Sequence, residues 1–212
     1  MRVKICGITT SDSLKAAVAA GAGYIGFNFF EKSPRYLDIP SATALAQEVP
    51  PGVCKVGLWV NPTNAELDAM LTVTPIDMIQ LHGCESVERV AEIKRIYGLP
   101  VMKVIGVSCA DDIAEISKFE HVADQILLDA KPPKDAVLPG GNGLAFDWRL
   151  IAGRRFATPW MLAGGLVPEN VAEAVRLTGA QQVDVSSGVE ASVGVKDDQL
   201  ISDFIRAANG DA

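Results

Sequence analysis

The 212-residue sequence has few of the features that mark membrane, exported or zinc-binding proteins. No apolar run approaches the roughly 20 residues that cross a bilayer, so no membrane partner is expected. Residues 1–6 have the pattern of a strand and not of a signal peptide, because no apolar stretch follows the basic residues. Without an export signal, the four cysteines are expected to stay reduced in the cytoplasm.

Metal-binding and basic groups are also scarce. The chain has two histidines, His82 and His121, and no Cys-x-x-Cys pair, so no metal site is expected. The formal net charge of −7 argues against a nucleic-acid partner, because binding the phosphate backbone requires a basic patch. The overall field would not attract an anionic substrate, which must therefore be held by local groups.

What the sequence does contain is an alternation of short apolar runs and helical patterns. Each gap between runs suits one strand plus one crossover helix, which predicts a parallel sheet. Between Ser11 and Gly21, for example, an apolar helix face is followed by a glycine suited to end the helix. Eight apolar runs begin near Arg2, Gly23, Val53, Ile76, Leu99, Asp124, Ala157 and Gln181.

Eight such units predict an α/β protein with one domain, a (β/α)₈ TIM barrel over residues 1–212. The alternative is an open doubly wound sheet. Such a sheet often has a glycine-rich turn after its first strand, and Cys6-Gly7-Ile8-Thr9 lacks the Gly-x-Gly-x-x-Gly pattern. The barrel is therefore the favoured architecture.

Residues at the carboxyl ends of barrel strands are candidates for function. Alternation puts Lys4 and Cys6 on one face of the first strand, and we expect them to point inward with a carboxylate near the lysine. A lone cysteine is usually inert core filler, but Cys6 stands at a strand end before a glycine turn. Asp129 ends the sixth strand, where the alternative is a turn or capping role. A thiol and a carboxyl there would form a base and an acid.

Two glycine- and serine-containing loops follow the last two predicted strands. Gly164 and Gly165 lie in the first loop, and Ser186, Ser187 and Gly188 lie in the second. Loops at these positions frequently bind phosphate in such barrels, since glycines let backbone N–H groups approach the oxygens. We therefore predict that the chain binds a phosphorylated small molecule at these two loops.

Two further residues are candidates for substrate binding. Arg35, after the second strand, is placed to clamp a carboxylate or a phosphate, or else is a solvated surface arginine. His82, after the fourth strand, is placed to polarise or position a substrate, whereas His121 has the surroundings of a surface residue.

The motifs together resemble those of the N-(5′-phosphoribosyl)anthranilate isomerase family of tryptophan biosynthesis. The resemblance covers the whole chain, and the combination of motifs is specific. The matching segments are Lys4-Ile5-Cys6-Gly7-Ile8, Ser33-Pro34-Arg35-Tyr36, Gln80-Leu81-His82-Gly83, Leu128-Asp129, Phe146-Asp147-Trp148, Ala163-Gly164-Gly165-Leu166 and Asp184-Val185-Ser186-Ser187-Gly188-Val189-Glu190.

This resemblance implies an Amadori rearrangement of N-(5-phosphoribosyl)anthranilate to 1-(2-carboxyphenylamino)-1-deoxyribulose 5-phosphate. Asp129 matches the family's general acid, which opens the ribose ring, and Cys6 matches its general base, which removes the C2′ proton. Arg35 matches the group that binds the anthranilate carboxylate, and Asp184 occupies the matching acidic position of the eighth strand. No metal or organic cofactor is expected, because both protons move within one substrate.

The sequence is compatible with several alternatives. Ala130 and Leu144 depart from the family's pattern and leave the contacts of the glycine-rich lid, residues 130–144, undecided. Another phosphate-binding barrel is an alternative, either a sugar-phosphate epimerase or an indole-glycerol-phosphate synthase that would use Lys4 or Lys103. A non-catalytic phosphate-binding barrel is a third hypothesis. We expect a monomer.

Overall fold

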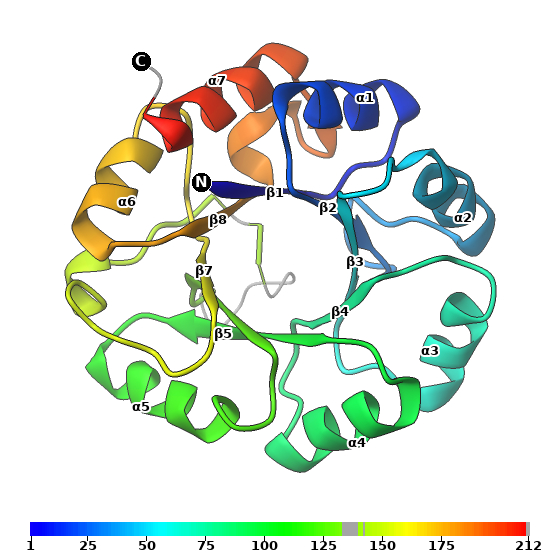
Figure 1. Ribbon diagram of the computed structural model, residues 1–212, viewed down its shortest axis with the longest axis horizontal. Helices are drawn as coiled ribbons and strands as arrows, with labels where there is room; N and C mark the ends of the chain where they lie inside the picture. Colours follow the sequence, from blue (N-terminus) through cyan, green and yellow to red (C-terminus); the bar gives the residue numbers. More distant parts are fainter. Residues whose placement is uncertain (133–139, 142, 211–212) are drawn as a thin grey trace.

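The computed structural model describes residues 1–132, 140–141 and 143–210. Eight parallel strands close into a barrel in their order along the chain, and helices surround it (Figure 1). The predicted TIM barrel is therefore confirmed. Each strand begins within three residues of its predicted position, and the largest difference is at Trp160 against Ala157. The strands are β1 (Arg2–Cys6), β2 (Tyr24–Asn28), β3 (Cys54–Trp59), β4 (Met78–Leu81), β5 (Val101–Val107), β6 (Gln125–Ala130), β7 (Trp160–Leu162) and β8 (Gln182–Val185).

The outer helices begin and end at residues with capping chemistry. The Thr10 side chain accepts a hydrogen bond from the Ser13 N–H at the start of α1, and Gly21 ends α1 with a φ of 98°. The helices are α1 (Ser11–Ala20), α2 (Ile39–Glu48), α3 (Asn64–Leu71), α4 (Val87–Tyr97), α5 (Ala110–Phe119), α6 (Val171–Thr178) and α7 (Asp198–Asn209).

The connection from β6 to β7 differs from the eight equal units that the sequence predicts. In the described part of this connection, a 3₁₀ helix, η1 (Trp148–Leu150), stands where an α-helix was expected. Asp147 accepts a hydrogen bond from the Arg149 N–H at its start, and Gly153 turns the chain soon afterwards with a φ of 69°. A single 3₁₀ turn therefore takes the place of an α-helix in the described part of this connection.

Two apolar clusters hold the barrel together. The larger lies between the strands and the surrounding helices. The smaller fills the barrel interior and consists of Tyr24, Val56, Met102, Val104, Leu127, Met161 and Ala163. Because side chains alternate along a strand, Asp129 lies on the same inward face as Leu127. The interior cluster thus forms a floor beneath the polar carboxyl ends of the strands.

Among the described residues, none of the helices combines the length and the apolar character that a membrane crossing requires.

Candidate active site

A buried ion pair lies at the base of the candidate site. Lys4 in β1 is paired in register with Asp184 in β8, and the Lys4 Nζ lies 2.8 Å from the Asp184 Oδ1. The Lys4 side chain is fully buried, so its charge needs this partner. The predicted inward lysine with a nearby carboxylate is therefore confirmed.

Cys6 lies above this pair on the same face of β1, beside Gly26 of β2. A Cβ at position 26 would come within 2.9 Å of the Cys6 Sγ and 3.1 Å of the Lys4 Nζ, so only glycine leaves the thiol its space. Burial raises the pKa of the Cys6 thiol above its ordinary value, and the Lys4 charge opposes this only in part. The Lys4 charge thus lowers this pKa, but desolvation outweighs it.

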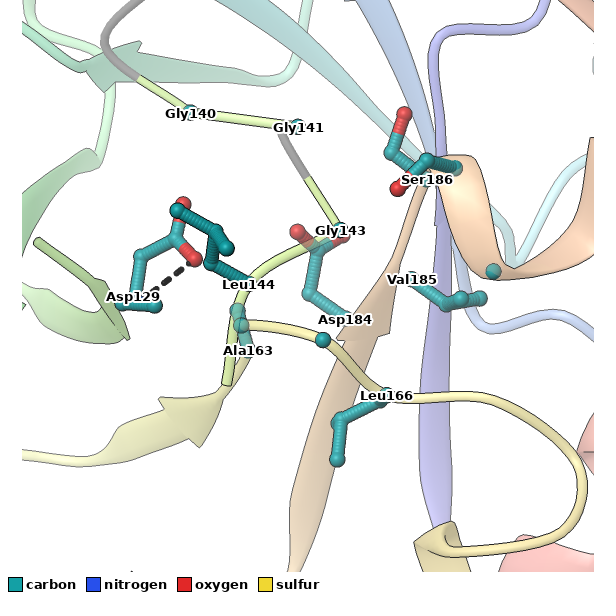
Figure 2. Close-up of a pocket in the computed structure, with 15 residues that line it drawn as sticks. Asp129, Gly140, Gly141, Gly143, Leu144, Ala163, Leu166, Asp184, Val185 and Ser186 are labelled. Atoms are coloured by element: carbon teal, nitrogen blue, oxygen red, sulfur yellow. Dashed lines mark hydrogen bonds between the residues drawn. The ribbon is translucent and has the colours of Figure 1, made fainter. Parts of the chain in front are cut away.

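Asp129 lies at the carboxyl end of β6, next to His82 from the end of β4. Its Oδ1 accepts a 2.8 Å hydrogen bond from the Ala130 N–H (Figure 2), and its Oδ2 lies 3.4 Å from the His82 Nε2. This Nε2 is buried and makes no hydrogen bond within the described ranges. A Cβ at Gly140 would lie 2.7 Å from the Asp129 Oδ2, so Gly140 passes directly over the carboxyl group. The prediction that these residues share one site agrees with their positions.

The loops after β7 and β8 line a second part of the site (Figure 2). Gly165 has a φ of 64°, and a Cβ there would come within 2.6 Å of the Ala145 N, so a side chain would be strained and would clash. Among the described residues, no hydrogen-bond acceptor is found for the backbone N–H groups of Gly164, Gly165, Ser187 and Gly188. These N–H groups are thus available to an anion.

Arg35 is buried and not on the surface, since only 4% of it is exposed. Its Nε and Nη2 donate to the two carboxylate oxygens of Glu190 at 2.7 and 2.8 Å. The remaining guanidinium nitrogen, Nη1, points toward Gly141, and a Cβ built at Gly141 would lie 3.0 Å from it. The sequence placed Arg35 in the site but gave no signal for its contact with Glu190, which is 155 residues away.

Apart from Lys4 and Glu190, which are buried behind them, these groups line two adjoining cavities. The two share Asp129, Gly140, Gly141, Asp184 and Ser186, and every site residue that the sequence predicted lines at least one of them. Sequence reasoning missed the apolar wall formed by Phe30, Leu58 and Val60. The predicted lid lies partly outside the described residues, at positions 133–139 and 142. Within the described ranges, no group of three or more His, Cys, Asp or Glu side chains is placed to bind a metal.

The chain is similar along nearly its whole length to known proteins of one family. A family model described as N-(5′-phosphoribosyl)anthranilate isomerase matches residues 3–207. The N-(5′-phosphoribosyl)anthranilate isomerase of Ruegeria sp. (strain TM1040) is 60% identical over 209 residues, which is 98% of this chain and 97% of that protein.

Two solved structures resemble the whole chain. One is described as monomers of the dimeric phosphoribosylanthranilate isomerase from Thermotoga maritima, with 36% identity, a TM-score of 0.86 and 99% of both chains covered. The other is the isomerase in complex with reduced 1-(o-carboxyphenylamino)-1-deoxyribulose 5-phosphate, with 36% identity, a TM-score of 0.87 and the same coverage. The isomerase activity that the sequence predicted is thereby confirmed: the chain belongs to the N-(5′-phosphoribosyl)anthranilate isomerase family.

Proposed function

We propose that Asp129 and Cys6 catalyse the isomerisation of N-(5′-phosphoribosyl)anthranilate by two proton transfers at the barrel mouth. Asp129 protonates the ribose ring oxygen as the bond from C1′ to that oxygen breaks, which leaves a protonated Schiff base. Cys6 then removes the C2′ proton, and the electron pair moves toward the imine nitrogen to give an enolamine. Tautomerisation of the enolamine yields the ketone. The supporting observation is that both groups line one cavity from different strands, β1 and β6.

The raised pKa of the Cys6 thiol bears on this mechanism. A thiol with a high pKa is a strong base once ionised, but little of it is ionised at neutral pH. The Lys4 ammonium beside it favours the thiolate, and Asp184 holds that lysine in place. We infer that Lys4 stabilises the thiolate form, and that the Asp184 Oδ2 accepts a hydrogen bond from a substrate hydroxyl.

The two ends of the substrate are proposed to occupy the two adjoining cavities. The backbone N–H groups around Gly165 and Ser187 would bind the phosphate, and Arg35 would bind the anthranilate carboxylate through Nη1. The His82 Nε2, which has no hydrogen-bond partner among the described residues, would contact the reacting sugar. The backbone N–H groups form one phosphate site. One site suits a substrate with a single phosphate better than the related aminoaldose of histidine biosynthesis, which carries two phosphates.

The position of Lys103 favours this reaction over that of a lysine-dependent synthase. Its Nζ donates to the Gly83 carbonyl at 2.8 Å and lies 2.9 Å from the Glu85 Oε2. Lys103 is buried in this pair and lines neither of the two cavities that hold Cys6 and Asp129. It is therefore in no position to attack a substrate held there.

We also infer that the enzyme works in the cytoplasm, because a thiol base functions only while it is reduced. The oligomeric state remains a prediction. A monomer is expected from the sequence, whereas the relative from Thermotoga maritima is described as dimeric. Sedimentation equilibrium of the purified chain distinguishes the two.

The test of the catalytic roles is a fluorescence assay of N-(5′-phosphoribosyl)anthranilate consumption. Cys6→Ala and Asp129→Asn are each expected to lower kcat by at least about 100-fold, the usual contribution of a positioned acid or base. Cys84→Ala, which alters an exposed cysteine, is the matched control. Near-normal turnover by either site variant would show that its residue is not the acid or the base.

A further inference from the structure

A short hairpin follows the loop after β8. It consists of β9 (Glu190–Ser192) and β10 (Val195–Lys196), and Glu190 and Lys196 face each other across it. Their side chains are only 4% and 0% exposed. Two charged side chains on a two-stranded hairpin would normally be solvated, so their burial calls for an explanation.

These two residues connect the parts of the site that are proposed to bind opposite ends of the substrate. Glu190 accepts two hydrogen bonds from Arg35 and one from the Lys196 Nζ at 2.8 Å. Lys196 also donates to the Ser186 carbonyl at 2.9 Å. The Ser186 hydroxyl in turn donates to the Cys6 carbonyl at 3.1 Å. One continuous chain of contacts therefore links Arg35, the loop after β8 and the backbone of the thiol base.

The charges of this cluster do not cancel. With Lys196 protonated, Arg35 and Lys196 are two cations against the single carboxylate of Glu190, and the lysine–aspartate pair nearby is neutral. Burial lowers the pKa of Lys196, and Glu190 opposes this effect. A buried excess of positive charge is costly unless an anion completes it. The Arg35 Nη1, which faces Gly141 at the cavity, is the nitrogen that Glu190 leaves free to meet such an anion.

We propose that Glu190 and Lys196 are positioning residues for the substrate. Glu190 holds the guanidinium of Arg35 so that only Nη1 reaches the cavity, and Lys196 fixes Glu190 to the phosphate-binding loop. The spacing between the carboxylate site and the phosphate site is thereby set by one hairpin. This inference rests on the proposed binding mode, in which Arg35 receives the substrate carboxylate.

Glu190→Gln separates positioning from simple electrostatics, because only positioning predicts weaker binding. Replacing the carboxylate by an amide makes the cluster more positive, or leaves its charge unchanged where Lys196 also loses its proton, so attraction alone predicts no loss in the binding of a carboxylated ligand. If Glu190 positions Arg35, the same change releases the guanidinium and weakens that binding. Glu190→Asp keeps the charge but shortens the side chain, so only a positioning role predicts a loss there.

The measurement is the dissociation constant of two ligands by calorimetry. The first is reduced 1-(o-carboxyphenylamino)-1-deoxyribulose 5-phosphate, and the second is its phenylamino counterpart without the carboxyl group. Glu190→Gln and Glu190→Asp are each expected to raise the Kd of the first ligand about tenfold and that of the second less than twofold. Combining Glu190→Gln with Arg35→Ala should weaken binding no further than Arg35→Ala alone.

Lys196→Met provides an independent arm. It removes the contact to the loop of Ser186, so it is expected to weaken both ligands and inorganic phosphate. The matched control for Glu190→Gln is Glu92→Gln, which makes the same substitution in the exposed pair of Glu92 with Arg89. If the Glu190 variants bind the carboxylated ligand as tightly as the wild type or more tightly, or lose both ligands equally, the positioning role is wrong. If the wild type itself binds neither ligand, the proposed function fails instead.

Discussion

Replacement of Asp184 by asparagine tests the energetics of the buried pair beneath Cys6. The variant keeps an oxygen that can accept a hydrogen bond from the Lys4 Nζ, but it removes the charge 2.8 Å away. Lys4 is fully buried, so its ammonium would be left without a compensating charge. We expect this variant to fold but to be substantially less stable than the wild type.

The expected magnitude follows from the burial of both groups. Removing one partner of a buried ion pair typically destabilises a protein by about 3–5 kcal/mol. In a protein of this size each kcal/mol lowers Tm by roughly 2–4 °C. Lys4→Met combined with Asp184→Leu removes both charges and should recover most of the loss, because it leaves no unpaired charge.

The pH dependence of the loss gives a sharper test. In the wild type, burial alone would lower the pKa of Lys4, but Asp184 and Cys6 raise it above its ordinary value. The contribution that depends on Lys4 is therefore complete below the unfolded lysine pKa of about 10.4 and is lost as the pH rises through the folded pKa. In Asp184→Asn, burial should instead lower the Lys4 pKa. The unfolded chain then binds more protons than the folded one, so stability rises with pH.

The assay is urea unfolding followed by tryptophan fluorescence at pH 7 and pH 9.5. Wild type and variant are both measured in a Cys6→Ala background, so that ionisation of the thiol does not contribute. The difference in unfolding free energy between wild type and Asp184→Asn should be smaller at pH 9.5 than at pH 7. The control at both pH values is Asp203→Asn, which alters an exposed pair with Arg206. A loss below 1 kcal/mol, or an equal loss at both pH values, would refute the reasoning.

Three further predictions follow from the site. Because burial raises the pKa of Cys6, its alkylation by iodoacetamide should still accelerate between pH 9 and 10; a plateau by pH 8.5, judged by mass spectrometry, would contradict this. Gly165→Ala should raise KM about tenfold or more because of its clash with Ala145; Gly179→Ala has a similar φ of 73° but open space, and should leave KM unchanged. Burial opposes the ionisation of Glu190, but Arg35 and Lys196 lower its pKa from 4.5 to about 2. Its contribution to stability is thus present above pH 4.5 and lost toward pH 2, so the stability difference between wild type and Glu190→Gln should narrow on acidification; a constant difference in urea titrations would contradict this.

The strands could be predicted because a parallel sheet covered on both faces produces continuous apolar runs. Alternation within β1 was then enough to place Lys4 and Cys6 on the inward face. The prediction of a helix between β6 and β7 was wrong in the described part of that connection. The spacing of the apolar runs gives only the length of a connection and not its structure. A connection of 29 residues, from Lys131 to Pro159, fits either a helix or an irregular segment.

The rule that a buried charge needs an oppositely charged partner predicted the surroundings of Lys4 but could not be applied to Lys196. Lys4 lies in an apolar strand, so periodicity predicts its burial, and burial requires the partner that proved to be Asp184. Lys196 lies in a segment with no apolar period, next to the exposed Val193 and Val195, so nothing local indicates that it is buried. Its burial depends on Glu190 folding back to meet Arg35, a contact that spans most of the chain. Charged residues in irregular segments are therefore where the structure adds most to the sequence, and here they set the geometry in which the substrate carboxylate would bind.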